Sequence, residues 1–128
     1  MNQGKKLSEK FYEVLKYEGV VSIMTSGIEP HLVNTWNSYI VVTDDERLLL
    51  PAYGFRKTGK NLEVNNQITI SVGSKSVLGF KDYQGTGFIV KGTAGFIDSG
   101  AEFDMMKEKF SFLNRVLEVT VESARQML

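Results

Sequence analysis

The chain has 128 residues, 42% of them hydrophobic and 23% charged, and its 15 basic residues balance its 15 acidic residues. These values predict one globular domain over residues 1–128, and a chain without a basic field is a poor candidate for binding nucleic acid. The absence of cysteine excludes disulfides, thiolate metal sites and a cysteine nucleophile.

The first element indicated along the chain is an amphipathic helix from Ser8 to Glu18, with Ser8 as its N-cap and Gly19 as its end. Its apolar face carries Leu7, Phe11, Val14 and Leu15. β-Branched and apolar runs then predict strands over 20–25, 31–43, 47–52, 67–74, 88–97 and 116–121. Further helices are expected over residues 58–65 and 101–110, and residues 122–128 read as a short tail.

The order of these elements indicates the fold class. The strands mostly follow one another, and the helices do not alternate with them, so a doubly wound parallel sheet is disfavoured. Closure into a barrel removes the exposed edges of six short strands. The sequence therefore predicts a mainly β fold with flanking helices, built on a six-stranded antiparallel barrel.

The segment over 31–43 is unusual because asparagines 34 and 37 disfavour a strand, and because polar and aromatic side chains share both of its faces. Asn34 and Trp36 fall on one face, and Thr35 falls on the other. One interpretation is an exposed strand with scattered polar residues. The other is a wall for a flat heteroaromatic ligand with polar edges.

A second segment, residues 53–61, leaves a strand and enters a helix with Lys57 and Thr58 at its start. Backbone N–H groups, a hydroxyl and cations suit a phosphate there, although a solvated loop fits equally well. Residues 73–76 could add Ser74 and Lys75 to the same anion or form a polar turn. Residues 84–87 are glycine-rich around Thr86, which allows close backbone approach to a ligand but also suits any tight loop.

Reactive groups of the protein itself are scarce. His31 is the only histidine and has no acidic partner nearby in sequence. No serine lies in a nucleophile-elbow pattern, and no spaced pair of carboxylates stands out. Any catalysis is therefore expected to reside in a cofactor.

Four stretches resemble the small bacterial FMN-binding proteins of the pyridoxamine 5′-phosphate oxidase-like family. They are Glu13–Val21, His31–Tyr39, Lys57-Thr58 with Asn61, and Gly85–Phe88. The Asn-Thr-Trp-Asn-Ser-Tyr stretch over 34–39 is the most specific of them, and the ending from Ser123 to Leu128 also matches. The resemblance implies a split β-barrel, non-covalent FMN and a homodimer with FMN at the subunit interface.

By the same resemblance, Asn34, Thr35 and Trp36 border the isoalloxazine ring, and Lys57 and Thr58 hold the phosphate. The expected cofactor-binding residues are Asn34, Thr35, Trp36, Pro51, Tyr53, Gly54, Lys57, Thr58, Ser74, Thr86 and Leu128. Leu128 and Phe112 are expected to approach the flavin of the partner chain. The family leads us to expect a tryptophan where Phe112 stands.

The leading functional hypothesis is a redox carrier or flavin-dependent oxidoreductase whose redox partner is unknown. A pyridoxamine 5′-phosphate oxidase is the runner-up, and the chain is short for that enzyme. A barrel that binds single-stranded nucleic acid is disfavoured by the neutral charge, and uptake of haem or deazaflavin would redirect the interpretation within the same fold. With no secretory pattern and no apolar run of roughly 20 residues, a cytoplasmic protein without membrane contact is expected.

Overall fold

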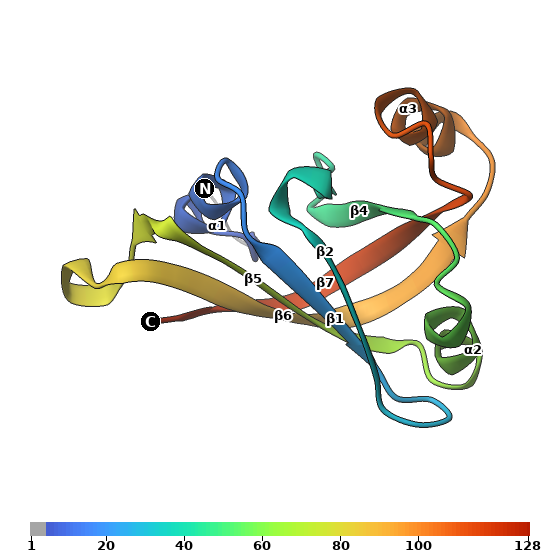
Figure 1. The fold of residues 1–128 in the computed structure, drawn as a ribbon, viewed down its shortest axis with the longest axis horizontal. Helices are drawn as coiled ribbons and strands as arrows, with labels where there is room; N and C mark the ends of the chain where they lie inside the picture. Colours follow the sequence, from blue (N-terminus) through green and yellow to red (C-terminus); the bar gives the residue numbers. More distant parts are fainter. Residues whose placement is uncertain (1–4) are drawn as a thin grey trace.

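The computed structural model describes residues 5–128 and contains one antiparallel sheet of seven strands in the order β2-β1-β5-β6-β7-β4-β3 (Figure 1). Its strands are β1 (Val20–Thr25), β2 (His31–Trp36), β3 (Val41–Val42), β4 (Arg47–Ala52), β5 (Gln67–Leu78), β6 (Gln84–Ile97) and β7 (Arg115–Met127). Its α-helices are α1 (Glu9–Leu15), α2 (Arg56–Val64) and α3 (Ala101–Lys109). Short 3₁₀ turns, η1 (Asn37–Tyr39) and η2 (Phe80–Asp82), complete the chain.

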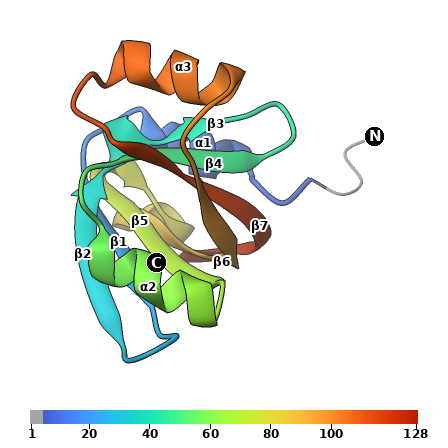
Figure 2. The same ribbon diagram turned by 90° about the vertical axis from the view of Figure 1, so that its right-hand side faces the viewer.

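The sheet curls into a half-barrel, so the mainly β class is confirmed (Figures 1 and 2). Alternate residues of the strands point inward and form the main core with α1. The largest fully buried side chains of this core are Phe11, Ile23, Leu48, Leu50, Ile70 and Leu117. Beneath α3, a smaller core gathers Leu49, Met106, Leu113 and Val116.

The predicted face of α1 is confirmed, because Phe11 and Val14 are fully buried and the Ser8 hydroxyl accepts a 3.2 Å bond from the Phe11 N–H. The helix ends earlier than predicted, at Leu15. Gly19 belongs instead to the approach to β1, where a Cβ would lie 2.0 Å from the Gly73 carbonyl oxygen of β5. The glycine therefore permits a close crossing of two backbones.

The prediction of one strand over residues 31–43 is wrong, and this accounts for seven strands in place of six. The chain leaves β2 after Trp36, turns through η1 and re-enters the sheet as β3. Asn37 causes the break: its backbone N–H donates to the Gly19 carbonyl, and its fully buried amide donates to the carbonyls of Val14, Tyr17 and Gly73. An asparagine that replaces ladder bonds with these contacts ends the strand.

Strands β5, β6 and β7 are longer than the sequence indicates. Residues 84–87 were expected as a loop, but they lie in β6, where Thr86 pairs with Ser74 of β5. Residues 122–128 were expected as a tail, but β7 continues to Met127 beside the start of β6. A shift in register between Lys91 and Gly92 lets both strands continue, and a Cβ on Gly92 would lie 2.0 Å from the Thr120 carbonyl.

None of the helices in residues 5–128 combines the length and the hydropathy that a membrane crossing requires.

Candidate functional site

The loop between β4 and α2 has an unusual backbone. Gly54 (φ 79°) and Phe55 (φ 53°) are both left-handed, and α2 begins directly afterwards at Arg56, two residues before the predicted start. The Gly54 N–H donates to Asn114 Oδ1 over 3.2 Å, and the guanidinium of Arg115 donates to the Gly54 carbonyl over 3.1 Å. As at the start of any α-helix, the first N–H groups of α2 have no partner within the helix, so a ligand at this end can accept bonds from them.

A cleft of about 200 Å³ lies where α2 meets the β1–β2 turn. It is lined by Ile28, Glu29, His31, Lys57, Lys60 and Asn61. Two ammonium groups and an imidazole face a single carboxylate there, so the cleft favours an anion. The structure thus places the predicted Lys57 next to His31, which the sequence left without a role.

Asn61 fixes the position of the cleft. Its Oδ1 accepts from the backbone N–H groups of Ile28 and Glu29, and its Nδ2 donates to the Thr25 hydroxyl and the Glu29 carbonyl. Both halves of the amide are therefore used, and only 2% of the residue is exposed. Helix α2 is consequently tied to the hairpin that carries β2, which brings the start of the helix beside His31.

Thr58 is fully buried in the first turn of α2, and its Oγ1 has no hydrogen-bond partner among residues 5–128. A buried hydroxyl without a partner costs free energy. A phosphate oxygen at the helix start would supply the acceptor that this hydroxyl lacks. The Lys57 ammonium, the Thr58 hydroxyl and the first N–H groups of α2 are of the chemical kind that holds an FMN phosphate at a helix start.

Strand β2 presents two of the three residues predicted to border the flavin ring. Asn34 and Trp36 are exposed on the outer face, whereas the Thr35 side chain is buried on the inner face. Asn34 Oδ1 accepts a 3.0 Å bond from the Ser22 hydroxyl of β1. Around this polar pair the outer face of the hairpin exposes the apolar side chains of Val20, Met24, Leu32 and Trp36.

The other residues predicted to bind the cofactor lie either near the β4–α2 loop or near the C-terminus. Pro51 is buried in β4, and Tyr53 is 69% exposed beside the loop. Ser74, Thr86 and Leu128 line a separate cavity of about 580 Å³ near the C-terminus. Figure 1 shows the C-terminus and η2 on the left and α2 on the right. Within one chain the 73–76 segment therefore lies in β5 beside this second cavity, and it does not form the polar turn that the sequence offered as an alternative.

The larger cavity is lined by glycines and polar residues together with the larger side chains of Val20, Tyr83 and Leu128. The Thr86 hydroxyl donates to the C-terminal main chain at Met127 and Leu128, and Gln84 bonds to the Lys75 carbonyl. Glu18, on its rim, accepts bonds from the hydroxyl and the N–H of Ser38, and these bonds lower the pKa of the carboxyl. A ligand there would meet hydroxyl groups together with the apolar and aromatic side chains of Val20, Tyr83 and Leu128.

Phe112, the other residue expected near a partner's flavin, is 46% exposed. Its ring centroid lies 5.6 Å from that of Tyr39 and 6.1 Å from that of Phe110. The three rings form an aromatic surface beside η1 and the end of α3.

Comparison with known proteins identifies the family. The model of the pyridoxamine 5′-phosphate oxidase family matches residues 7–128. The chain belongs to this family. It is 44% identical over 119 residues to the FMN-binding protein of Nitratidesulfovibrio vulgaris, covering 92% of this chain and 96% of that protein.

Solved structures share the fold at low identity. HupZ of Group A Streptococcus superposes with a TM-score of 0.74 at 17% identity, over 92% of this chain and 91% of that one. The heme storage protein HutZ of Vibrio cholerae superposes with a TM-score of 0.60 at 16% identity, over 97% and 95%. The split-barrel fold expected from the sequence is therefore confirmed, with seven strands.

Several side chains that hold the candidate site in place could not be identified from the sequence. Asn114 and Arg115 lie at the start of β7 and reach the loop over residues 53–55 only through the sheet pairing of β7 with β4. The bonds of Asn61 to the hairpin were equally invisible, although the residue was noted as part of the family pattern. No local signal marks these contacts, because they join segments that are 32 to 61 residues apart.

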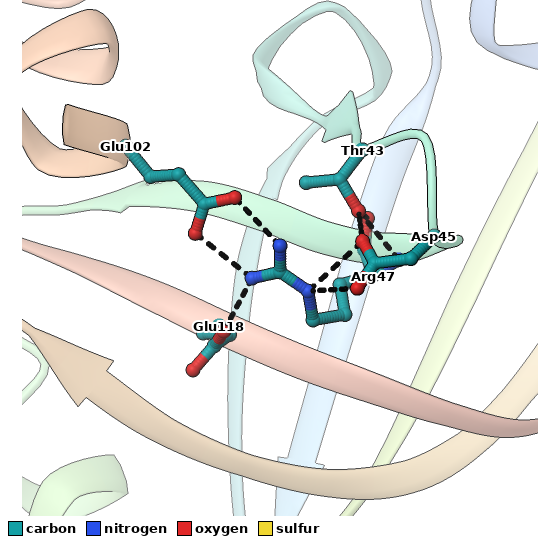
Figure 3. Close-up of polar contacts among 5 residues, drawn as sticks. All are labelled: Thr43, Asp45, Arg47, Glu102 and Glu118. Atoms are coloured by element: carbon teal, nitrogen blue, oxygen red, sulfur yellow. Dashed lines mark hydrogen bonds and ion pairs between the residues drawn. The ribbon is translucent and has the colours of Figure 1, made fainter.

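A cluster of charges around Arg47 joins the sheet to α3 and shares no residue with either cavity. Arg47 of β4 bonds to Asp45, to both carboxyl oxygens of Glu102 in α3, and to Glu118 of β7 (Figure 3). These bonds raise the pKa of Arg47 and lower the pKa of Asp45 and Glu102. The cluster ties α3 to the sheet.

Proposed function

We propose that this chain is a flavoprotein that binds FMN non-covalently and serves in electron transfer or flavin-dependent oxidoreduction. The observation that carries the proposal is the first turn of α2, where Lys57 lines the cleft and the buried Thr58 hydroxyl has no partner among residues 5–128. This turn offers charge, a hydroxyl donor and helix N–H groups to a phosphate dianion. The FMN-binding protein that is 44% identical over nearly the whole chain supports the choice of flavin.

In this proposal the residues of one chain have separate tasks. Lys57 neutralises the phosphate, with Lys60 and His31 completing the cleft, and Thr58 donates its hydroxyl to a phosphate oxygen. The ring lies along the outer face of β2, where Asn34 offers polar contacts and Trp36 offers an aromatic surface. Bound FMN would supply the redox chemistry, and the protein would bind, orient and shield it.

We further propose that the working unit is a homodimer in which a second copy completes the site. Two observations support this. Ser74, Thr86 and Leu128 line a cavity near the C-terminus, away from the cleft that holds Lys57. The outer face of the β1–β2 hairpin exposes Val20, Met24, Leu32 and Trp36, the kind of apolar patch that marks an interface. A two-fold axis would set the cavity of one chain near the flavin of the other.

Titration of the apo protein tests the proposal. Wild-type protein is expected to turn yellow with FMN and to prefer it over riboflavin, FAD and haem. Lys57→Ala should weaken FMN binding by about 1–3 kcal/mol, the scale of a charge-assisted hydrogen bond. Lys109→Ala, which removes an exposed lysine of α3, is the matched control and should bind normally. Equal affinity of wild type and Lys57→Ala for FMN would remove the phosphate assignment.

Two further measurements test the proposed homodimer and the alternative of a pyridoxamine 5′-phosphate oxidase. Sedimentation of Leu32→Asp against wild type tests the dimer, because a carboxylate on the apolar patch should favour monomers and weaken FMN binding together. Turnover with pyridoxamine 5′-phosphate tests the oxidase alternative. An electron-transfer protein is expected to leave that amine unoxidised, although its flavin accepts electrons from an added chemical reductant.

A further inference from the structure

The N–H and the carbonyl of Gly54 are both hydrogen-bonded to side chains at the beginning of β7, one from its first residue and one from the residue before it. The N–H donates to Asn114 Oδ1, and the carbonyl accepts from the Arg115 guanidinium. Resting on the proposed FMN site, we propose that Asn114 and Arg115 are positioning residues. They hold the loop over residues 53–55 in the conformation that presents Lys57 and the start of α2 to a phosphate.

The loop needs such a restraint. Gly54 and Phe55 have φ values of 79° and 53°, and a phenylalanine rarely adopts the left-handed region unless its surroundings enforce it. No Cβ contact constrains Gly54, because a Cβ built there meets nothing within 4 Å among residues 5–128. The conformation of Gly54 therefore depends on its two hydrogen bonds and on Phe55, which packs against the main core.

Arg115 is itself fixed in place. Its Cζ lies 3.8 Å from the centroid of the Phe96 ring in β6, a cation–π arrangement. Its guanidinium also covers Gly59 of α2, since two of its nitrogens lie 3.5 and 3.7 Å from the position of a Cβ there. One side chain thus contacts the loop, the helix and the sheet.

Asn114 is fixed by its own backbone, because its N–H donates to the Ala52 carbonyl over 2.8 Å at the end of β4. The two residues therefore set the loop against β4 before any ligand arrives. Because the loop is already ordered, ligand binding does not have to offset the entropy cost of ordering it. This preorganisation increases the affinity.

Hydrogen exchange and flavin titration of the full apo chain test this. The Gly54 amide should be protected in wild type and exchange faster in Asn114→Ala and Arg115→Met. Both variants should bind FMN about three- to tenfold more weakly, the effect of one modest hydrogen bond. Their affinity for riboflavin, which lacks the phosphate, should change much less.

Three results would overturn the proposal. Unchanged FMN affinity in both variants would remove any role in binding. A loss confined to Arg115→Met and restored by Arg115→Lys would make the arginine a phosphate ligand instead. Equal losses for FMN and riboflavin with a lower melting temperature would show a merely structural role. Failure of wild type to bind flavin at all is a separate result, and it would count against the proposed function itself.

Discussion

The two edges of the sheet are held in different ways. At the β2 edge, neutral amides make the ties: Asn37 anchors the end of the strand, and Asn61 anchors the turn before it. At the β3 edge, the neighbouring strand β4 is tied to α3 and β7 by Arg47 and the carboxylates of Glu102 and Glu118 (Figure 3). One edge therefore depends on buried dipoles and the other on half-exposed charges.

The difference predicts how each edge responds to its surroundings. Hydrogen bonds made by a buried, neutral amide do not depend on pH or salt. The attraction between half-exposed charges is weakened by salt and is lost when one partner changes its protonation state. The candidate phosphate cleft lies at the amide-held edge, between α2 and the β1–β2 turn. The amide bonds of Asn61 that join α2 to this turn carry no charge, so they neither titrate nor weaken with salt.

The largest effect is expected from Asn37→Asp. The Nδ2 of Asn37 donates to three backbone carbonyls in a site with no solvent exposure. A carboxylate would lose these bonds and face the same oxygens, which should cost about 4 kcal/mol or more of unfolding free energy. Urea unfolding at neutral pH measures it.

Asn61→Asp is the matched control, because it makes the same change at the other amide. There Oδ1 already accepts two backbone N–H bonds, and the Thr25 hydroxyl can turn to donate. Only the bond to the Glu29 carbonyl is lost outright, so a cost of about 1–2 kcal/mol is expected. If Asn61→Asp were as harmful as Asn37→Asp, the two amides would not differ as the structure indicates.

A smaller effect is expected from Arg47→Met, about 1 kcal/mol at neutral pH after allowance for solvent screening. The pKa of Glu102 is lowered from 4.5 by its bonds to Arg47, so its contribution is present above that value and is lost as the pH falls through the lowered pKa. Wild type and variant should therefore converge in acid and in about 1 M salt, where screening acts within a few ångströms.

Arg125→Met, at an exposed arginine of β7, is the control for Arg47→Met and should leave stability unchanged. Thermal unfolding in neutral and in strongly acidic buffer measures both. A difference between wild type and Arg47→Met that persists in acid would mean that packing, rather than charge, holds α3. The contrast between the two edges would then disappear.

The sequence predicted the β class, the core face of α1 and most of the strands, because alternation and helical periodicity depend on neighbouring residues. It failed where a side chain acts over a distance. Asn37 looked like a poor strand residue within one long strand, and its bonds to carbonyls far away in the sequence, such as that of Gly73, explain why it ends that strand. Likewise a local pattern was enough to name Lys57 as a candidate phosphate ligand, whereas the contact of Arg115 with Gly54 required the pairing of β4 with β7.

The smallest change in stability, and the most informative about function, is expected from Thr58→Val. On the same helix Asn61 has every polar atom paired, whereas the buried Thr58 hydroxyl has no partner among residues 5–128. Valine keeps the shape and removes the unpaired group, so the apo protein should be unchanged or up to about 1 kcal/mol more stable. If the hydroxyl serves the phosphate, FMN affinity should nevertheless fall while riboflavin affinity holds. A stabilised variant that binds FMN as well as wild type would show that Thr58 has no part in the site. A destabilised variant would show that the hydroxyl is paired in solution, through a partner such as a buried water.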